Sequence, residues 1–217
     1  MLAGDYLLAR VMTNLSNHGN VRLIQYTAQV ISDLLEGEWI QDSLVRDWNI
    51  SLGQLDRVHN LKTGSLFKWC LRAPFLAAER FEADLHTELD ELGTLLGLLF
   101  QRSDDLLDFD VRNYEGKATL GDLKSGYLNS FSVWLLHGAS REARDGFLKS
   151  QTLADVHRAL GETWFEERLT AFDSTNQNLI DLYLHRLDRL PRLLSERERP
   201  WIDDVRGLAQ PLYWRKK

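Results

Sequence analysis

Apolar residues recur at helical spacing along most of the chain. From Leu7 to about Leu35 they follow the 3.6-residue period, with a break at residues 17–20, where Asn-His-Gly-Asn is typical of a turn between two helices. The period is clearest between about 82 and 112, which carries leucines at positions 85, 89, 92, 96, 99 and 106. A helical pattern also covers residues 56–80, and Pro74 predicts a break or kink near Ala73.

The second half of the chain is also predicted to be helical, after a loop. Residues 113–129 contain three glycines, at 116, 121 and 126, and are expected to form a loop with short turns. Helices are expected over 131–137, 141–160, 162–190 and 201–209, with a polar connection at 195–200. No segment alternates like a strand, and no heptad persists as in a coiled coil. The predicted fold class is therefore all-α, a single helical bundle over residues 1–217.

Composition narrows the range of functions. The 217 residues are 44% hydrophobic and 27% charged, as in globular proteins that bury a core. The net charge of −6 argues against a nucleic-acid partner, which usually requires a basic surface. Cys70 is the only cysteine, so no internal disulfide forms. The longest apolar run, around residues 95–100, is far shorter than the roughly 18 residues of a membrane span, and no signal peptide is visible, so a cytoplasmic protein is expected.

An acidic cluster, Asp104, Asp105 and Asp108, stands near the end of the strongest predicted helix. Asp104 and Asp108 are four residues apart and share a face, while Asp105 lies about 100° round the helix from Asp104. Like charges at this spacing, at the negative end of a helix, are unfavourable unless a cation neutralises them. Carboxylates suit Mg²⁺, which completes its shell with water and substrate phosphate. The alternative is a solvated acidic helix end, since aspartates are common on surfaces.

Neighbouring residues favour the metal interpretation. Phe100 and Gln101 precede Asp104 by about one turn, and Lys117 follows in the glycine-rich loop. A diphosphate needs both a metal and cationic side chains to balance its charge. Carboxylates, an amide and a lysine in this order therefore indicate a diphosphate clamp.

Four segments together resemble one family, the trans-isoprenyl diphosphate synthases. Residues 97–108, followed by Gly116-Lys117 and residues 122–126, resemble its second aspartate-rich region. Residues 4–9 resemble the helix after its first aspartate-rich motif, Leu-Glu-Gly-Glu-Trp-Ile-Gln at 35–41 its L-x-G-E-x-x-Q segment, and Lys-Thr-Gly-Ser-Leu at 62–66 its K-T-A-x-L segment. The match covers the motif-bearing part, 1–131, whereas the C-terminal helices, 132–217, agree in helical character and length. The resemblance implies an all-α bundle of the isoprenoid synthase type.

The resemblance also implies roles for particular residues. Mg²⁺ would bridge an allylic diphosphate to Asp104, Asp105 and Asp108. Lys62 and Lys117 would contact that diphosphate.

The remaining implied roles concern the hydrocarbon part of the substrates. Thr63 and Gln101 would stabilise the developing carbocation through their oxygens, and Phe100 would line the pocket near the isopentenyl group. Glu36, Glu38 and Gln41 are expected to make structural polar contacts, with substrate contact as the alternative. Gly93 and Gly97 indicate either close helix packing or room for a prenyl chain.

The sequence departs from the family in two respects. The family's G-K-x-x-R site, first DDxxD motif and Arg-Arg pair have no counterpart in these residues, and its G-K-x-T pattern reads Gly-Tyr-Leu-Asn at 126–129. We therefore expect an N-terminally truncated synthase acting as a prenyltransferase subunit, weak or inactive alone, which needs the first aspartate-rich motif from elsewhere. A non-catalytic protein binding a prenyl diphosphate or lipid, and a reading frame that begins upstream, remain alternatives.

The expected partners are a prenyl diphosphate and a second copy of the chain. Apolar residues in segments 5–16 and 21–40 exceed what a short bundle needs for its own core. Exposed apolar surface usually marks a contact site. In the resembling family the helices that correspond to these two segments build most of the homodimer contact. A homodimer with residues 5–40 at its centre is therefore predicted, with a second subunit supplying the missing half-site as a further possibility.

Overall fold

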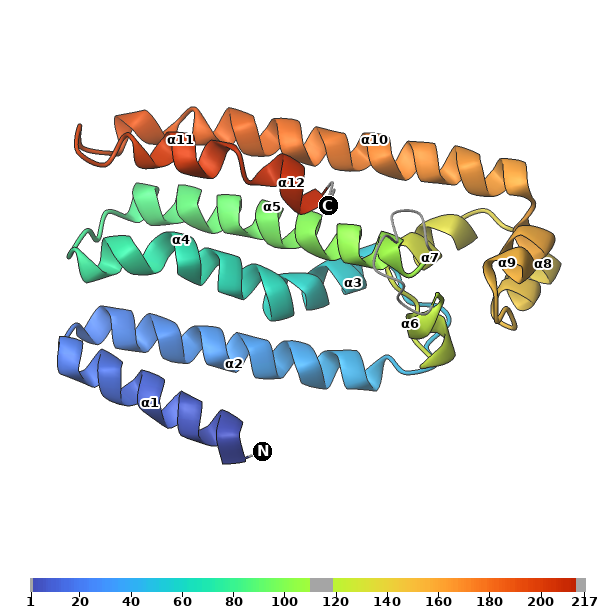
Figure 1. The fold of residues 1–217 in the computed structure, drawn as a ribbon, viewed down its shortest axis with the longest axis horizontal. Coiled ribbons are helices and arrows are strands. Elements are labelled where there is room, and N and C mark those ends of the chain that lie inside the picture. Colours follow the sequence, from blue (N-terminus) through green and yellow to red (C-terminus); the bar gives the residue numbers. More distant parts are fainter. Residues whose placement is uncertain (1, 110–118, 214–217) are drawn as a thin grey trace.

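The computed structural model describes residues 2–109 and 119–213, and regular structure in these ranges is helical throughout. The all-α fold class is confirmed. Five long helices lie side by side (Figure 1): α1 (Leu2–His18), α2 (Val21–Ser43), α4 (Ser65–Ala77), α5 (Ala83–Leu107) and α10 (Glu162–Leu187). The predicted turn at 17–20 separates α1 from α2, where the Asn20 side chain accepts a hydrogen bond from the Leu23 amide and caps α2.

Shorter elements complete the chain. Near the C-terminal end of α5 lie α3 (Leu52–His59), the π-helix η1 (Asn60–Gly64), α6 (Gly121–Lys124) and α7 (Ser130–Leu136). Beyond them are α8 (Arg141–Phe147) and α9 (Leu153–Leu160). The chain returns along α10 through η2 (Leu190–Arg192), α11 (Trp201–Arg206) and α12 (Ala209–Tyr213).

Three predicted boundaries are corrected by the structure. Residues 141–160 form two helices, because Thr152 and Asp155 make a capping box that starts α9 separately. Residues 201–209 are divided where α11 ends at Arg206. Pro74 does not break its helix: it lies in the last turn of α4, which ends at Ala77. Helical residues follow the proline as well as precede it, so the predicted break is wrong.

Helix α5 is the centre of the core. The six leucines that define its predicted period have no exposed surface: Leu85, Leu89, Leu92, Leu96, Leu99 and Leu106. Helix α5 contacts α4 and η1, and also α10 and α12. A Cβ atom on Gly97 would lie 2.5 Å from the Gly64 Cα, and one on Gly93 would lie 2.6 Å from the Lys68 nitrogen. Both glycines therefore serve close helix packing, one of the two alternatives that their spacing suggested.

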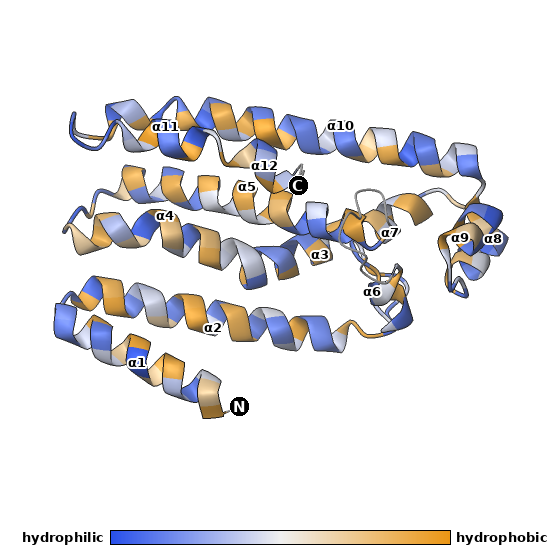
Figure 2. Ribbon diagram, viewed as in Figure 1, coloured by the Kyte–Doolittle hydropathy of each residue, from blue (hydrophilic) through white to orange (hydrophobic). Residues whose placement is uncertain are grey.

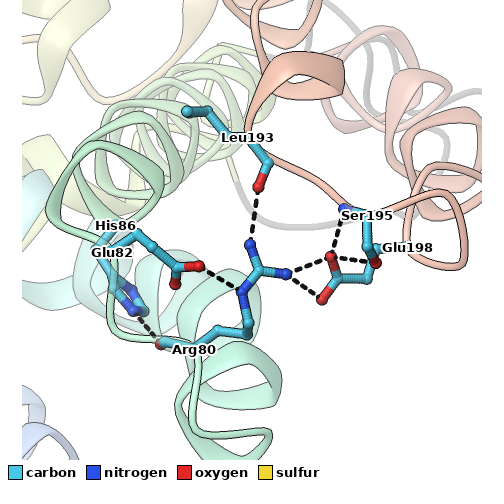
Figure 3. Close-up of polar contacts among 6 residues, drawn as sticks. All are labelled: Arg80, Glu82, His86, Leu193, Ser195 and Glu198. Carbon is cyan, nitrogen blue, oxygen red and sulfur yellow. Dashed lines mark hydrogen bonds and ion pairs between the residues drawn. The ribbon is translucent and has the colours of Figure 1, made fainter.

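Arg80, in the turn between α4 and α5, ties this part of the chain to the C-terminal segment (Figure 3). Its guanidinium donates to the Leu193 carbonyl at 2.8 Å, to Glu198 Oε1 at 2.6 Å and to Glu82 at 2.7 Å. Glu198 also accepts the Ser195 amide at 2.8 Å. Residues before and after 131 share one hydrophobic core. No helix among the described residues is long and apolar enough to cross a membrane.

Candidate functional site

The π-helix η1 brings Lys62 and Thr63 close to α2 and α5. Single π-turns are rare and often occur at functional sites. Glycines let the three elements approach: a Cβ atom on Gly37 of α2 would lie 2.7 Å from the Lys62 Cγ. Lys62 and Thr63 therefore lie between α2 and α5, two helices that are far apart in the sequence.

Lys62 is held by the segment at 35–41. Its Nζ forms an ion pair with Glu38 at 2.5 Å and donates to the Gln41 side-chain oxygen at 2.6 Å. The lysine side chain is 28% exposed, so the ammonium keeps contact with solvent. Glu36 pairs instead with Arg57 at 3.0 Å. All three residues make the polar contacts that the sequence predicted for them.

A hydrogen-bond chain links η1 to the acidic end of α5. The Thr63 hydroxyl donates to the Gln101 side-chain oxygen at 3.2 Å, and the Gln101 amide donates to Asp105 Oδ1 at 3.0 Å. The two residues expected to share a role are therefore direct neighbours. The Asp105 carboxylate in turn fixes the orientation of the Gln101 amide, because its other oxygen, Oδ2, accepts hydrogen bonds from a different part of the chain.

Asp105 points into the protein. Only 3% of the residue is exposed, and its Oδ2 accepts hydrogen bonds from the Ser130 hydroxyl and, at 2.8 Å, from the Ser130 amide. Burial raises the pKa of Asp105 to about 6, although the hydrogen bonds from Ser130 and Gln101 act in the opposite direction. Asp105 thereby joins the end of α5 to the start of α7.

Asp108 organises the next turn of the chain. Its two carboxylate oxygens accept the backbone amides of Gly121, at 2.5 Å, and of Asp122, at 3.3 Å. These are the first two residues of α6. Burial and the neighbouring Asp122 raise the pKa of Asp108 to about 6. The carboxylate thus takes the place of a helix cap.

The three aspartates do not converge as the acidic cluster suggested. Among residues 2–109 and 119–213, no group of three or more His, Cys, Asp or Glu side chains is placed to hold a metal ion. The physical reason is the helix geometry: Asp105 faces the interior, away from half-buried Asp104, and Asp108 turns toward α6. The donor set does not form a cage of three carboxylates.

A cavity of about 180 Å³ lies between these elements. It is lined by three of the predicted site residues, Lys62, Gln101 and Asp105. Phe100 packs on Phe67, with ring centroids 5.7 Å apart, and does not line the cavity. Lys117 lies outside the described residues.

His59 and Asn129 also line the cavity, although the motifs did not point to them. His59 is 8% exposed, and burial lowers its pKa to about 4, so its imidazole is neutral at pH 7. Its position one turn before Lys62 could have placed it here. Asn129 donates to Asp122 at 3.0 Å, and its side-chain oxygen caps α7 through the Ser132 amide at 2.9 Å. It occupies the last position of the altered G-K-x-T pattern.

Comparison with known proteins identifies the family. The model of the family described as polyprenyl synthetase matches residues 1–160, which include η1, α5 and the acidic cluster. The chain belongs to the polyprenyl synthetase family. The family predicted from the four motifs is therefore confirmed.

Relatives and solved structures agree with this membership. Chloroplastic solanesyl diphosphate synthase 1 of Arabidopsis thaliana is 32% identical over 142 residues, which are 65% of this chain and 35% of that protein. The chain thus spans about a third of that relative's length. A decaprenyl diphosphate synthase from Rhodobacter capsulatus has a TM-score of 0.81 at 24% identity, covering 100% of this chain and 66% of that one. A polyprenyl synthase from Caulobacter crescentus CB15, complexed with calcium and isoprenyl diphosphate, has a TM-score of 0.80 at 23% identity, with the same coverage.

Proposed function

We propose that the chain binds an allylic prenyl diphosphate through Mg²⁺ and acts in isoprenoid biosynthesis as a prenyltransferase subunit. The first aspartate-rich motif would come from outside these 217 residues. The observation that carries the proposal is that Lys62, Gln101 and Asp105 line one cavity, with Thr63 hydrogen-bonded to Gln101 beside it. The Caulobacter polyprenyl synthase, of the same fold, was crystallised with a divalent cation and an isoprenyl diphosphate.

In this proposal the three aspartates have different roles. Mg²⁺ usually takes one or two carboxylates and completes its shell with water and phosphate, so a three-carboxylate cage is not required. Asp104 is the principal ligand, while Asp105 and Asp108 hold the end of α5 against α7 and α6. When bound, the cation would neutralise charge on the diphosphate.

Lys62 is a cationic side chain that lines the cavity. Its ammonium would leave Glu38 and Gln41 in part and donate to a phosphate oxygen, as charge-assisted hydrogen bonds favour. Lys117 would add a second ammonium, and Phe100 a nearby apolar surface. The Thr63 and Gln101 oxygens would face the allylic cation. Because ionisation of an allylic diphosphate requires strong stabilisation of the leaving group, the isolated chain is expected to bind substrate but to condense little.

Titration of geranyl diphosphate in the presence of Mg²⁺, followed by calorimetry, tests the proposal. Lys62→Met should weaken binding about tenfold, since a hydrogen bond to a charged group contributes about 1.5–3 kcal/mol. Lys149→Met removes an exposed lysine outside the cavity and is the matched control. Equal affinities for the wild-type and Lys62→Met proteins would refute the role of this lysine.

A non-catalytic protein that binds a prenyl diphosphate or another lipid in this cavity is the second candidate. It is favoured by the hydrogen bonds on both carboxylate oxygens of Asp105 and of Asp108, which occupy groups expected to bind metal. Geranyl diphosphate affinity that is unchanged by EDTA would support this candidate over the subunit proposal.

The second part of the proposal is a homodimer built on α1 and α2. Helix α1 buries no residue and packs on α2 at the edge of the array (Figure 1). Figure 2 shows apolar residues along this outer helix. Its exposed large apolar side chains are Leu2, Tyr6, Leu7, Leu8 and Val11. Such a surface is typical of a contact site.

A further inference from the structure

A second cavity, of about 490 Å³, adjoins the candidate site. Ile50 and Leu128 line both cavities, but none of the predicted site residues lines the second one. Its walls come from the start of α3, from α7 and from the facing sides of α8 and α10. Its volume falls within the range of about 300–1,000 Å³ that is typical of small-molecule sites.

The lining combines an apolar wall with two guanidinium groups. The wall includes Leu52, Val133 and Trp134, while Arg144 of α8 and Arg168 of α10 contribute the charges. No acidic side chain lines the cavity.

Both arginines donate their observed hydrogen bonds to uncharged oxygens. Arg144 donates to the Asn49 side chain at 3.4 Å, and Arg168 donates to the His137 carbonyl at 2.6 Å while stacking over the Trp164 ring. Neither forms an ion pair within the described part of the chain. Two half-buried cations beside an apolar surface therefore lack a counter-charge there.

We propose that this cavity binds a single-chain amphipathic anion. The apolar tail lies against Leu52, Val133 and Trp134, and the anionic head lies between Arg144 and Arg168. The planar guanidinium fork matches a carboxylate or a phosphate, and both groups supply the missing charge. A cationic head would be repelled, and a neutral apolar ligand would desolvate the arginines without compensation. Binding here requires no Mg²⁺, which separates it from the prenyl diphosphate site.

Calorimetric titration of the full 217-residue chain with decanoate and with decyl phosphate, both in EDTA, tests the proposal. Decyltrimethylammonium has the same tail and a cationic head, and it should bind at least tenfold more weakly than the better anion. Saturable binding of either anion supports the proposal, and the preferred one identifies the head group. Absence of saturable binding by both anions, or binding of the cation with equal affinity, would overturn it.

Substitutions in the lining of the second cavity test whether the ligand binds there. Arg144→Gln should weaken anion binding about tenfold, as expected for loss of one charge-assisted contact. Arg141→Gln, on the same helix but outside the lining, is the matched control and should change nothing. Val133→Trp should also weaken binding by filling the cavity, provided that its circular dichroism spectrum is native. If Arg144→Gln binds like the wild type, the proposal fails regardless of how Val133→Trp folds.

The two proposals fail separately. Asp104→Asn should leave decanoate and decyl phosphate binding in EDTA unchanged. A changed affinity in Asp104→Asn, higher because a repelling carboxylate is gone, would place the ligand in the candidate site and would overturn the second-cavity proposal. Loss of Mg²⁺-dependent geranyl diphosphate binding alone would concern only the proposed function.

Discussion

Helices α5 and α1 both carry apolar residues at helical spacing, yet the fold treats them differently. Helix α5 is covered by α4 on one side and by α10 on another, and it buries residues from Leu85 to Leu107. Helix α1 packs on α2 at the edge of the array and leaves Leu7, Leu8 and Val11 exposed. An amphipathic pattern thus predicts that a face will be covered, but it does not say whether the same chain or a partner covers it.

The largest expected difference between the two helices comes from one substitution made in both. Gly97→Ala in α5 should lower the free energy of unfolding by about 3 kcal/mol, because the new Cβ atom would meet the Gly64 backbone at 2.5 Å. Gly4→Ala in α1 should be neutral or stabilise by up to about 1 kcal/mol, since nothing lies within 4 Å of its Cβ position. Urea denaturation measures both. Equal effects at the two positions would contradict the packing described here.

A buried carboxyl group gives a second difference between α5 and α1, and its expected effect on stability is of intermediate size. Helix α5 buries Asp105, whose pKa is raised to about 6, whereas an unfolded chain releases that proton near pH 4. Between these values the folded state binds more protons than the unfolded state, so stability falls as pH rises from about 4 to about 6. The expected loss is about 2 kcal/mol, and Asp108 contributes in the same direction.

Denaturation of wild type and Asp105→Asn between pH 4 and 7.5 measures this dependence. The neutral side chain should flatten the profile. A variant profile as steep as that of the wild type would show that Asp105 does not cause the slope.

The smallest effect on folding is expected for charges placed on α1. Val11→Asp should change the free energy of unfolding of a protomer by less than about 0.5 kcal/mol, because Val11 is exposed. It should nevertheless dissociate the proposed homodimer, whereas Asn178→Asp, which adds the same charge at an exposed position of α10 outside the proposed interface, serves as control. Light scattering after gel filtration gives the mass. A wild-type mass near that of one 25.1 kDa chain would rule the dimer out.

The contrast between α5 and α1 also shows which features of the structure the sequence could predict. The leucine repeat of α5 predicted the position of this helix and its buried face, because leucines at a regular helical spacing all lie on one side of the helix. Local capping was harder to anticipate, and Thr152 with Asp155 divided a segment predicted as one helix. The motifs located Lys62, Gln101 and the aspartates, but not the direction in which Asp105 and Asp108 point. That direction depends on donors from Ser130 and Gly121, which only the folded chain brings to them.

Mg²⁺ dependence of geranyl diphosphate binding tests the central proposal most directly. Calorimetry should give an affinity at least tenfold higher in Mg²⁺ than in EDTA for the wild-type chain. In Asp104→Asn the two affinities should be equal and low. Binding that is equally tight with and without Mg²⁺, or unaffected by Asp104→Asn, would contradict the account.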